Sequence, residues 1–100
     1  MEIEAFKANF DYLLFERILQ EQNEYRFYYL AWQPSLFDDG VIVRIAGRKL
    51  DGRQQIFAPL PYPTFEEAWP TIRAIIRKRL RNGYRIVDAA ICEEEHQPTP

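Results

Sequence analysis

Residues 41–58 read VIVRIAGRKLDGRQQIFA, and the fold expected for the chain follows from this stretch. Apolar residues recur at alternate positions from Val41 to Ile45, which predicts a strand over 41–46. The residues at 50–53, Leu-Asp-Gly-Arg, are typical of a tight hairpin turn, and 54–58 predicts the returning strand. The stretch therefore predicts an antiparallel hairpin.

Basic residues gather around this hairpin. Arginine offers a planar, bidentate fork that matches a phosphate group, and glycine lets a ligand approach the backbone closely. A strand that ends in such a turn holds its cations in position to meet an anion, although a solvated hairpin with ordinary surface cations has the same pattern. The residues concerned are Arg44, Arg48, Lys49 and Arg53 around Gly47 and Gly52.

Further strands are indicated on both sides of the hairpin. The run YRFYYLAW at 25–32 is dense in aromatic residues, as a well-buried strand is. Residues 12–19 are rich in aromatic and aliphatic side chains and fit either a strand or a helix. Residues 84–87 fit a short last strand, and polar residues predict turns at 20–24 and 37–40.

The aromatic residues of 25–32 divide between two faces. If this segment is a strand, Tyr25, Phe27 and Tyr29 share one face, and Tyr28 and Trp32 share the other. We expect one of the two sets to lie in the core. Exposed aromatic side chains on a sheet stack on the bases of single-stranded nucleic acid in some proteins, and a purely structural role for both sets is the alternative.

One helix is clearly indicated. Prolines between 59 and 63 exclude regular structure there and lead into Thr64, which makes a capping box with Glu67. Gly83 predicts the end of the helix. Pro70 lacks an amide donor and predicts a kink, or a restart of the helix with Pro70 as its first residue. Helical spacing places one apolar face on Phe65, Ala68, Trp69, Ile72, Ile75, Ile76 and Leu80.

The order of these elements predicts an α+β fold. Several strands, one helix and a last strand favour an antiparallel sheet of four or five strands with the helix packed on one face. We expect an N-terminal extension at 1–11, the folded domain at 12–87 and an acidic, disordered tail at 88–100.

Several classes of protein are not indicated. The chain has 100 residues and contains neither an apolar run long enough to span a membrane nor a signal peptide. Its single cysteine, Cys92, suits the reducing cytoplasm. His96 has no partner at metal-ligand spacing, and Ser35 has no suitable base. We therefore expect a cytoplasmic protein with no catalytic site, no metal and no cofactor.

Charge is strongly segregated along the chain. Between 44 and 85 there are ten cations and three acids, a net charge of +7, and the rest of the chain carries −9. This distribution predicts a positive face on a protein whose total charge is −2. The alternative is that folding intersperses the two signs. Arg79 falls among the apolar positions of the helix, so we expect its stem to pack on the core and its guanidinium to reach solvent or a carboxylate.

Residues from about 12 to 87 also resemble one known family. The similarity rests on Tyr25-Arg26-Phe27-Tyr28, Gln33-Pro34-Ser35-Leu36-Phe37, Ala46-Gly47-Arg48, Gly52, Ala68 and Gly83-Tyr84. In order and approximate spacing these residues resemble a WGR domain, which occurs beside the catalytic domain of poly(ADP-ribose) polymerases and as small bacterial proteins.

The resemblance implies an antiparallel sheet with one helix, no catalytic activity, and a role in binding DNA or neighbouring domains. The Trp and Arg of the family's motif lie at these contacts. Gly47 and Arg48 match the motif, and Ala46 replaces its Trp.

Two hypotheses of function follow. The first is a non-catalytic module that binds the phosphate backbone of nucleic acid, most simply DNA, with little sequence specificity. The second is a protein-interaction adaptor that binds an acidic partner or itself. The residues expected at the nucleic-acid site are Arg44, Gly47, Arg48, Lys49, Arg53 and the helix stripe Arg73, Arg77 and Arg81.

Overall fold

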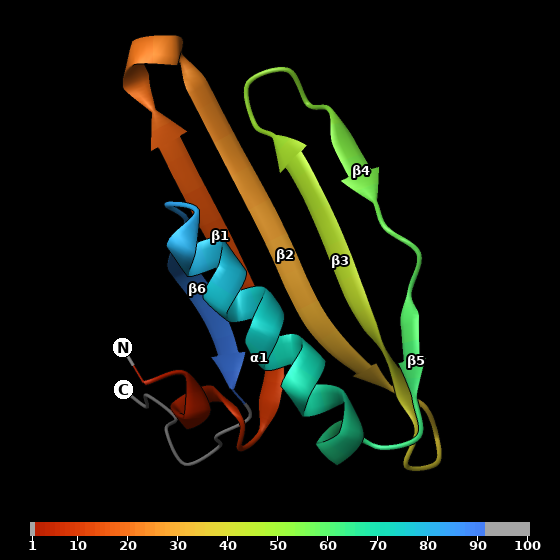
Figure 1. Ribbon diagram of the computed structural model, residues 1–100. Coiled ribbons are helices and arrows are strands. Elements are labelled where there is room, and N and C mark those ends of the chain that lie inside the picture. The colour runs from red at the N-terminus through yellow and green to blue at the C-terminus, as the bar shows by residue number, and fades with distance from the viewer. Residues whose placement is uncertain (1, 92–100) are drawn as a thin grey trace, which may run out of the picture.

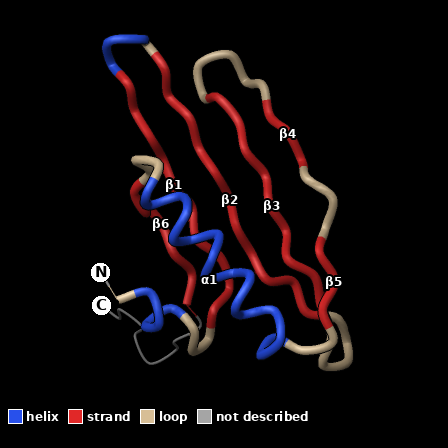
Figure 2. The backbone as a smooth tube through the Cα atoms, in the orientation of Figure 1, coloured by secondary structure: helices blue, strands red, loops and turns tan. Residues whose placement is uncertain are grey.

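The computed structural model describes residues 2–91 as one antiparallel sheet with a long helix across it (Figure 1). Figure 2 shows the strands, in red, running side by side with the helix α1 lying across them. The elements in chain order are η1 (Ile3–Phe6), β1 (Phe10–Leu19), η2 (Gln20–Gln22), β2 (Glu24–Pro34), β3 (Gly40–Arg48), β4 (Gln54–Ile56), β5 (Leu60–Tyr62), α1 (Phe65–Arg81) and β6 (Arg85–Ile91).

The sheet is five strands wide, in the order β4-β3-β2-β1-β6, and every pairing is antiparallel. A sixth strand, β5, pairs with the other end of β3, on the same edge as β4. The chain crosses the sheet through α1 and returns as β6 beside β1. The predicted α+β fold class is thereby confirmed, and residues 12–19, which fitted a strand or a helix, lie within β1.

The prolines before the helix do not exclude a strand, and the sequence prediction is wrong at this point. Residues 60–62 form β5, in which Pro61 faces Val41 of β3. Proline donates no ladder hydrogen bond, and edge strands accommodate it because one side of the strand has no partner. The strand predicted at 54–58 is correspondingly shorter, because β4 ends at Ile56.

Local signals set both ends of α1. The Thr64 hydroxyl accepts a hydrogen bond from the Glu67 amide at 3.1 Å, as the capping box predicts. At the other end Gly83 has a φ of 91°, and the Tyr84 amide donates to the Arg79 carbonyl at 3.0 Å in a Schellman arrangement. The helix is continuous through Pro70, so the predicted restart does not occur.

The core lies between α1 and one face of the sheet. Phe15, Leu30 and Ile42 of three adjacent strands are fully buried, and so are Ile72 and Ile76 of the helix. Burying side chains of this size contributes about 1.5–3 kcal/mol each to the driving force for folding.

The opposite face of the sheet has no helix on it within residues 2–91. Tyr28 and Trp32 point into the core, whereas Tyr25, Phe27 and Tyr29 lie half-buried on the other side, which we call the open face. The predicted division of the aromatic residues between two faces is confirmed.

The sheet extends beyond 12–87 at both ends, from Phe10 to Ile91. The predicted N-terminal extension contains η1, and there the Glu4 carboxylate accepts hydrogen bonds from Trp69 Nε1 at 3.1 Å and Arg73 Nη1 at 2.8 Å. Residues 92–100 of the predicted tail lie outside the described residues.

Candidate nucleic-acid interface

Strand alternation divides the predicted hairpin cations between the two faces of the sheet. Arg44 and Arg48 are two positions from Ala46 in β3 and lie on its helix side, opposite Leu30 and Arg26 of β2. Lys49 follows Arg48 and points to the open face, where its ammonium group binds the Glu16 carboxylate. The hairpin cations therefore do not form one patch.

The charges of Lys49 and Glu16 neutralise each other in an ion pair. The Lys49 ammonium lies 4.8 Å from the centre of the Tyr25 ring, and the Tyr25 hydroxyl donates to Glu16 Oε1 at 3.0 Å. The hydrogen bond from Lys49 lowers the pKa of the buried Glu16 carboxyl, and the same bond raises the pKa of Lys49. Lys49 is therefore paired on the open face, on the other side of the sheet from Arg44 and Arg48.

The helix stripe is also divided. Arg73, at the middle of α1, is held by Glu4 of η1. Arg77 and Arg81 are exposed and make no ion pair with any residue between 2 and 91. The expectation that hairpin and helix cations converge in a single patch is wrong for this set of residues.

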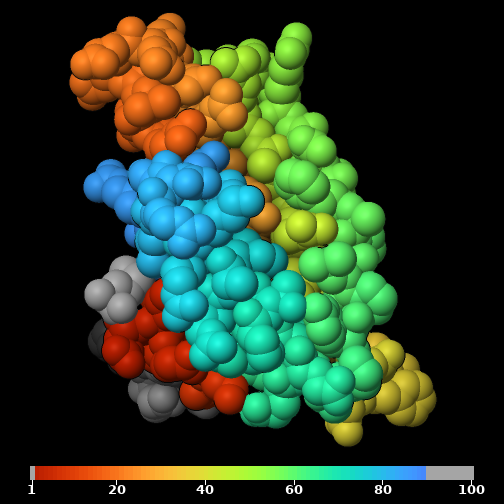
Figure 3. Space-filling model, in the orientation of Figure 1, coloured from red at the N-terminus to blue at the C-terminus, as the bar shows by residue number. Residues whose placement is uncertain are grey.

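A different set of arginines does converge. Figure 1 shows that the β1–β2 and β3–β4 hairpin ends extend beyond the C-terminal end of α1, so the sheet is uncovered there on its helix side. The space-filling view of that side shows the surface receding between these segments (Figure 3). A hollow of about 250 Å³, which we call the arginine hollow, is lined by Arg26, Ala46, Gly47, Arg48, Arg53, Gln54, Gln55 and Tyr84.

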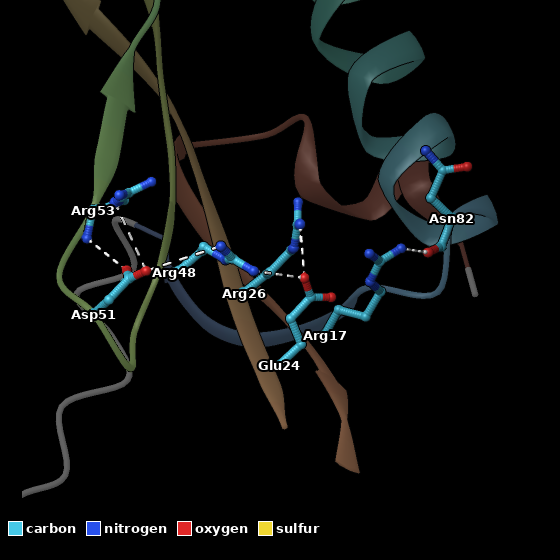
Figure 4. A network of polar contacts seen from close by, with 7 residues as sticks. All are labelled: Arg17, Glu24, Arg26, Arg48, Asp51, Arg53 and Asn82. Carbon is cyan, nitrogen blue, oxygen red and sulfur yellow. Dashed lines mark hydrogen bonds and ion pairs between the residues drawn. The ribbon is translucent and has the colours of Figure 1, made fainter. Parts of the chain in front are cut away.

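Cations outnumber acids in this hollow. Glu24 Oε2 accepts from both Arg26 Nη2, at 2.8 Å, and Arg48 Nη2, at 3.1 Å (Figure 4). Asp51 is the second acid, 3.9 Å from Arg48 and 4.0 Å from Arg53. One carboxylate oxygen thus serves two guanidinium groups, and Arg53 has only a distant partner.

The arginine side chains keep solvent-facing surface despite these contacts. Between 40% and 79% of the Arg26, Arg48 and Arg53 side chains is exposed, against 13% for Glu24. The acid beneath the arginines therefore positions them, and their outer surfaces stay accessible. The hydrogen bond from Arg26, with further help from Arg48, lowers the pKa of the Glu24 carboxyl, so this acid is ionised at neutral pH.

A second row of arginines lies against aromatic rings beside the hollow. Arg79 lies 4.6 Å from the Tyr28 ring centre and 5.4 Å from that of Tyr84, and Arg17 lies 5.2 Å from Tyr84. Arg44 stacks on Phe57 at 5.0 Å. These cation–π contacts fix the guanidinium groups without neutralising them. The guanidinium of Arg79 was expected to reach solvent or a carboxylate. It lies instead against the rings of Tyr28 and Tyr84.

The buried Nε atoms of this region have no hydrogen-bond partner. Within residues 2–91 they are the only buried side-chain nitrogen or oxygen atoms of this kind, on Arg17, Arg26, Arg44 and Arg79. Arg17 donates one bond, from Nη1 to the Asn82 carbonyl at 3.1 Å (Figure 4). The arginine cluster is thus rich in donors and poor in acceptors.

Some of these residues could be predicted from the sequence and others could not. Three of the predicted residues, Gly47, Arg48 and Arg53, line the hollow, whereas Arg26, Arg17 and Arg79 were not assigned to a binding site. Arg26 faces Arg48 across β2 and β3, and Arg17 faces Arg26 across β1 and β2. The pairing of three basic positions is a signal that appears only once the strand register is known.

Gly47 has a structural explanation in addition to its place in the hollow. A Cβ atom there would lie 2.5 Å from the Arg53 carbonyl oxygen and 2.7 Å from the Phe27 ring. The Phe27 side chain therefore occupies the space that a side chain at position 47 would need. Ala46, where the resembled family has Trp, is half-buried and leaves the hollow open.

Comparison with family models, curated proteins and solved structures found no match for the chain. No helix in the described part of the chain is long and apolar enough to cross a membrane. Among residues 2–91, no three potential metal-ligating side chains gather into a site.

Proposed function

We propose that the protein is a non-catalytic, WGR-like module that binds the phosphate backbone of nucleic acid, most simply DNA, in the arginine hollow. The observation that carries this proposal is the excess of accessible guanidinium groups over acids around one open hollow. Arg26, Arg48 and Arg53 share two carboxylates, and one oxygen of Glu24 is common to two of them. The resemblance in sequence to DNA-binding WGR domains supports the same ligand.

The chemistry of the hollow fits phosphate. Guanidinium groups bind phosphate oxygens through paired N–H donors, and backbone contacts of this kind carry no information about base sequence. Cation–π contacts hold neighbouring arginines in place, which reduces the entropy lost when an anion binds. We therefore expect modest affinity, strong dependence on salt and little preference among sequences.

The magnitude of the salt dependence tests the proposal. If three guanidinium groups each neutralise one phosphate of a duplex, log K falls against log salt with a slope of about −2.7. Fluorescence anisotropy with a labelled 20-base-pair duplex between 50 and 200 mM salt measures this slope. A single strand of the same length is the second probe, and its slope is expected to be about −2.

A matched pair of variants locates the contact. Arg53→Glu reverses an exposed charge in the hollow, and Arg77→Glu reverses an exposed charge on the helix stripe. We expect the first variant to weaken binding at least tenfold and to reduce the slope by about 0.9 or more, because one phosphate contact is lost. The second should change affinity by less than threefold. Equal losses of DNA affinity in the two variants would show that binding depends on the general charge of the protein and not on the arginine hollow. If the wild-type protein does not bind DNA at 50 mM salt, the proposed function is excluded.

The second candidate function is a protein-interaction adaptor. The open face favours it, because that face is apolar and carries neither α1 nor η1. An acidic partner is not favoured there, since Lys49 already binds Glu16. Capture of a partner that persists after nuclease treatment would support this function over nucleic-acid binding.

A further inference from the structure

The open face of the sheet is an apolar surface that the proposed phosphate site does not use. Its centre consists of Leu14 of β1, Phe27 and Tyr29 of β2, and Val43 and Ile45 of β3. Cross-strand pairing joins these residues directly, with Leu14 opposite Tyr29 and Tyr29 opposite Ile45. Within residues 2–91, α1 and η1 both pack on the other side, so nothing in the described chain pairs with this surface.

The sequence of the strands indicates that a partner covers this face. A sheet with one solvated face alternates apolar and polar side chains, whereas strands buried on both faces read as nearly continuous apolar runs. Tyr25–Trp32 of β2 has one charged residue, Arg26, and that residue lies on the helix side. The open face of β2 therefore has the composition of a buried surface.

The charge of the open face excludes several occupants. Lys49 and Glu16 neutralise each other, and Asp88 accepts a hydrogen bond from the Tyr12 hydroxyl at 3.0 Å. Arg85 lies opposite Glu16 in the β1–β6 register, and Asp11 lies beside Tyr29 and Val43, so the charges on this face cancel except for one excess acid. A nearly neutral surface does not attract a polyanion. The C-terminal residues EEEHQPTP are acidic and lack aliphatic side chains, so they do not match it either.

The area of the face matches what a stable dimer requires. The six strands together have 43 residues, and at a rise of about 3.4 Å per residue and a spacing of about 4.8 Å they give a face of about 700 Å². Two copies would together bury roughly 1,400 Å², which lies within the standard range for specific protein interfaces.

We infer that the open face binds the same face of a second copy of this chain. The two sheets would pack face to face about 10 Å apart around a twofold axis, as the layers of a β-sandwich do. Phe27, Tyr29 and Val43 would lie near the axis and contact the partner chain. The arginine hollow is on the helix side, so this interface leaves it accessible.

Sedimentation of the full-length chain tests the inference. Each chain has a mass of 12.0 kDa, and we expect a species of twice that mass at about 10–100 μM protein. Val43→Lys puts one lysine from each copy at the centre of the interface, and we expect it to raise the dimer dissociation constant at least 100-fold. Ala74→Lys adds the same charge at an exposed position of α1 and should leave the dimer unchanged.

Two results would overturn the inference. One is a wild-type chain that stays monomeric at 100 μM, which would leave another protein as the occupant of the face. The other is a Val43→Lys variant that unfolds cooperatively, and is therefore folded, but still dimerises. If Val43→Lys does not fold, Val43→Thr serves as the milder variant, with an expected loss of at least fivefold. DNA affinity per chain should change by less than threefold in any of these variants, so the inference and the proposed function can fail separately.

Discussion

Replacement of Gly47 by alanine tests whether this motif glycine is required by the fold itself. Gly47 lies in β3, where Phe27 of β2 faces it across the open side of the sheet. An added Cβ would lie 2.5 Å from the Arg53 carbonyl oxygen and 2.7 Å from Cε2 of Phe27. Both contacts are closer than Cβ atoms normally make, so the hairpin and the ring must move.

The cost follows from what must move. The Arg53 carbonyl accepts the hydrogen bond from the Arg48 amide, at 2.9 Å, that closes the hairpin. Losing this bond costs about 1 kcal/mol, and overpacking beside Phe27 costs about 1–3 kcal/mol. The free energy of unfolding should therefore fall by about 2–4 kcal/mol. For a domain of this size that lowers Tm by ~10–30 °C.

Thermal and urea unfolding followed by circular dichroism measure the loss. Gly52→Ala is the reference variant, because no atom lies within 4 Å of the added Cβ and only the φ of 72° is unfavourable, at about 1 kcal/mol. Phe27→Ala combined with Gly47→Ala should lose less stability than the sum of the single changes, because the ring contact is gone. A Gly47→Ala variant that melts within about 3 °C of wild type would refute this reasoning.

Three further predictions concern an ion pair, a core position and the wall of the arginine hollow. Arg26 and Arg48 lower the pKa of Glu24 below its ordinary 4.5, so its ion pairs stabilise the fold above that pH and are lost as pH falls through the lowered pKa. Urea unfolding between pH 5 and 3 should accordingly show a shallower loss of stability for Glu24→Gln than for wild type. Ile72→Ala empties a fully buried position and should cost about 2–5 kcal/mol, whereas Ile56→Ala, at a residue 67% exposed, should cost less than about 0.5 kcal/mol in the same urea assay. Ala46→Trp places an indole in the wall of the hollow and should weaken DNA binding at least tenfold by anisotropy, whereas tighter binding would favour direct contact by the indole.

Elements defined by local signals could be predicted from sequence. The capping box at Thr64 and the glycine at 83 set α1 to within a residue, because cap hydrogen bonds involve neighbours in the chain. The run 25–32 lies within β2 for a similar reason, since its aromatic density is a property of the segment itself. β5 was missed because tolerance of Pro61 depends on its place at the sheet edge, which the segment does not reveal.

The site depended on register and was only partly predictable. Arg48 and Lys49 are adjacent in sequence, but the strand extends to Arg48 and separates their side chains onto opposite faces. The strand predicted from the pattern ends at 46, and both cations were therefore expected on one hairpin turn. Arg26 is 22 positions before Arg48 and lies beside it only through the β2–β3 pairing. The shared ion pair of both arginines with Glu24 likewise forms only when the chain folds.

The two proposed surfaces lie on opposite sides of one sheet, which constrains how they work together. Stacking of two open faces directs the two arginine hollows away from each other, because each hollow is on the helix side of its own sheet. A short oligonucleotide then reaches only one hollow, so dimerisation adds no avidity on short DNA. A long or looped nucleic acid can reach both, and the dimer would then link two segments. Strand alternation in β3 places Arg44 and Arg48 on the helix side and Val43 and Ile45 on the open face, which makes this arrangement possible in a sheet only one layer thick.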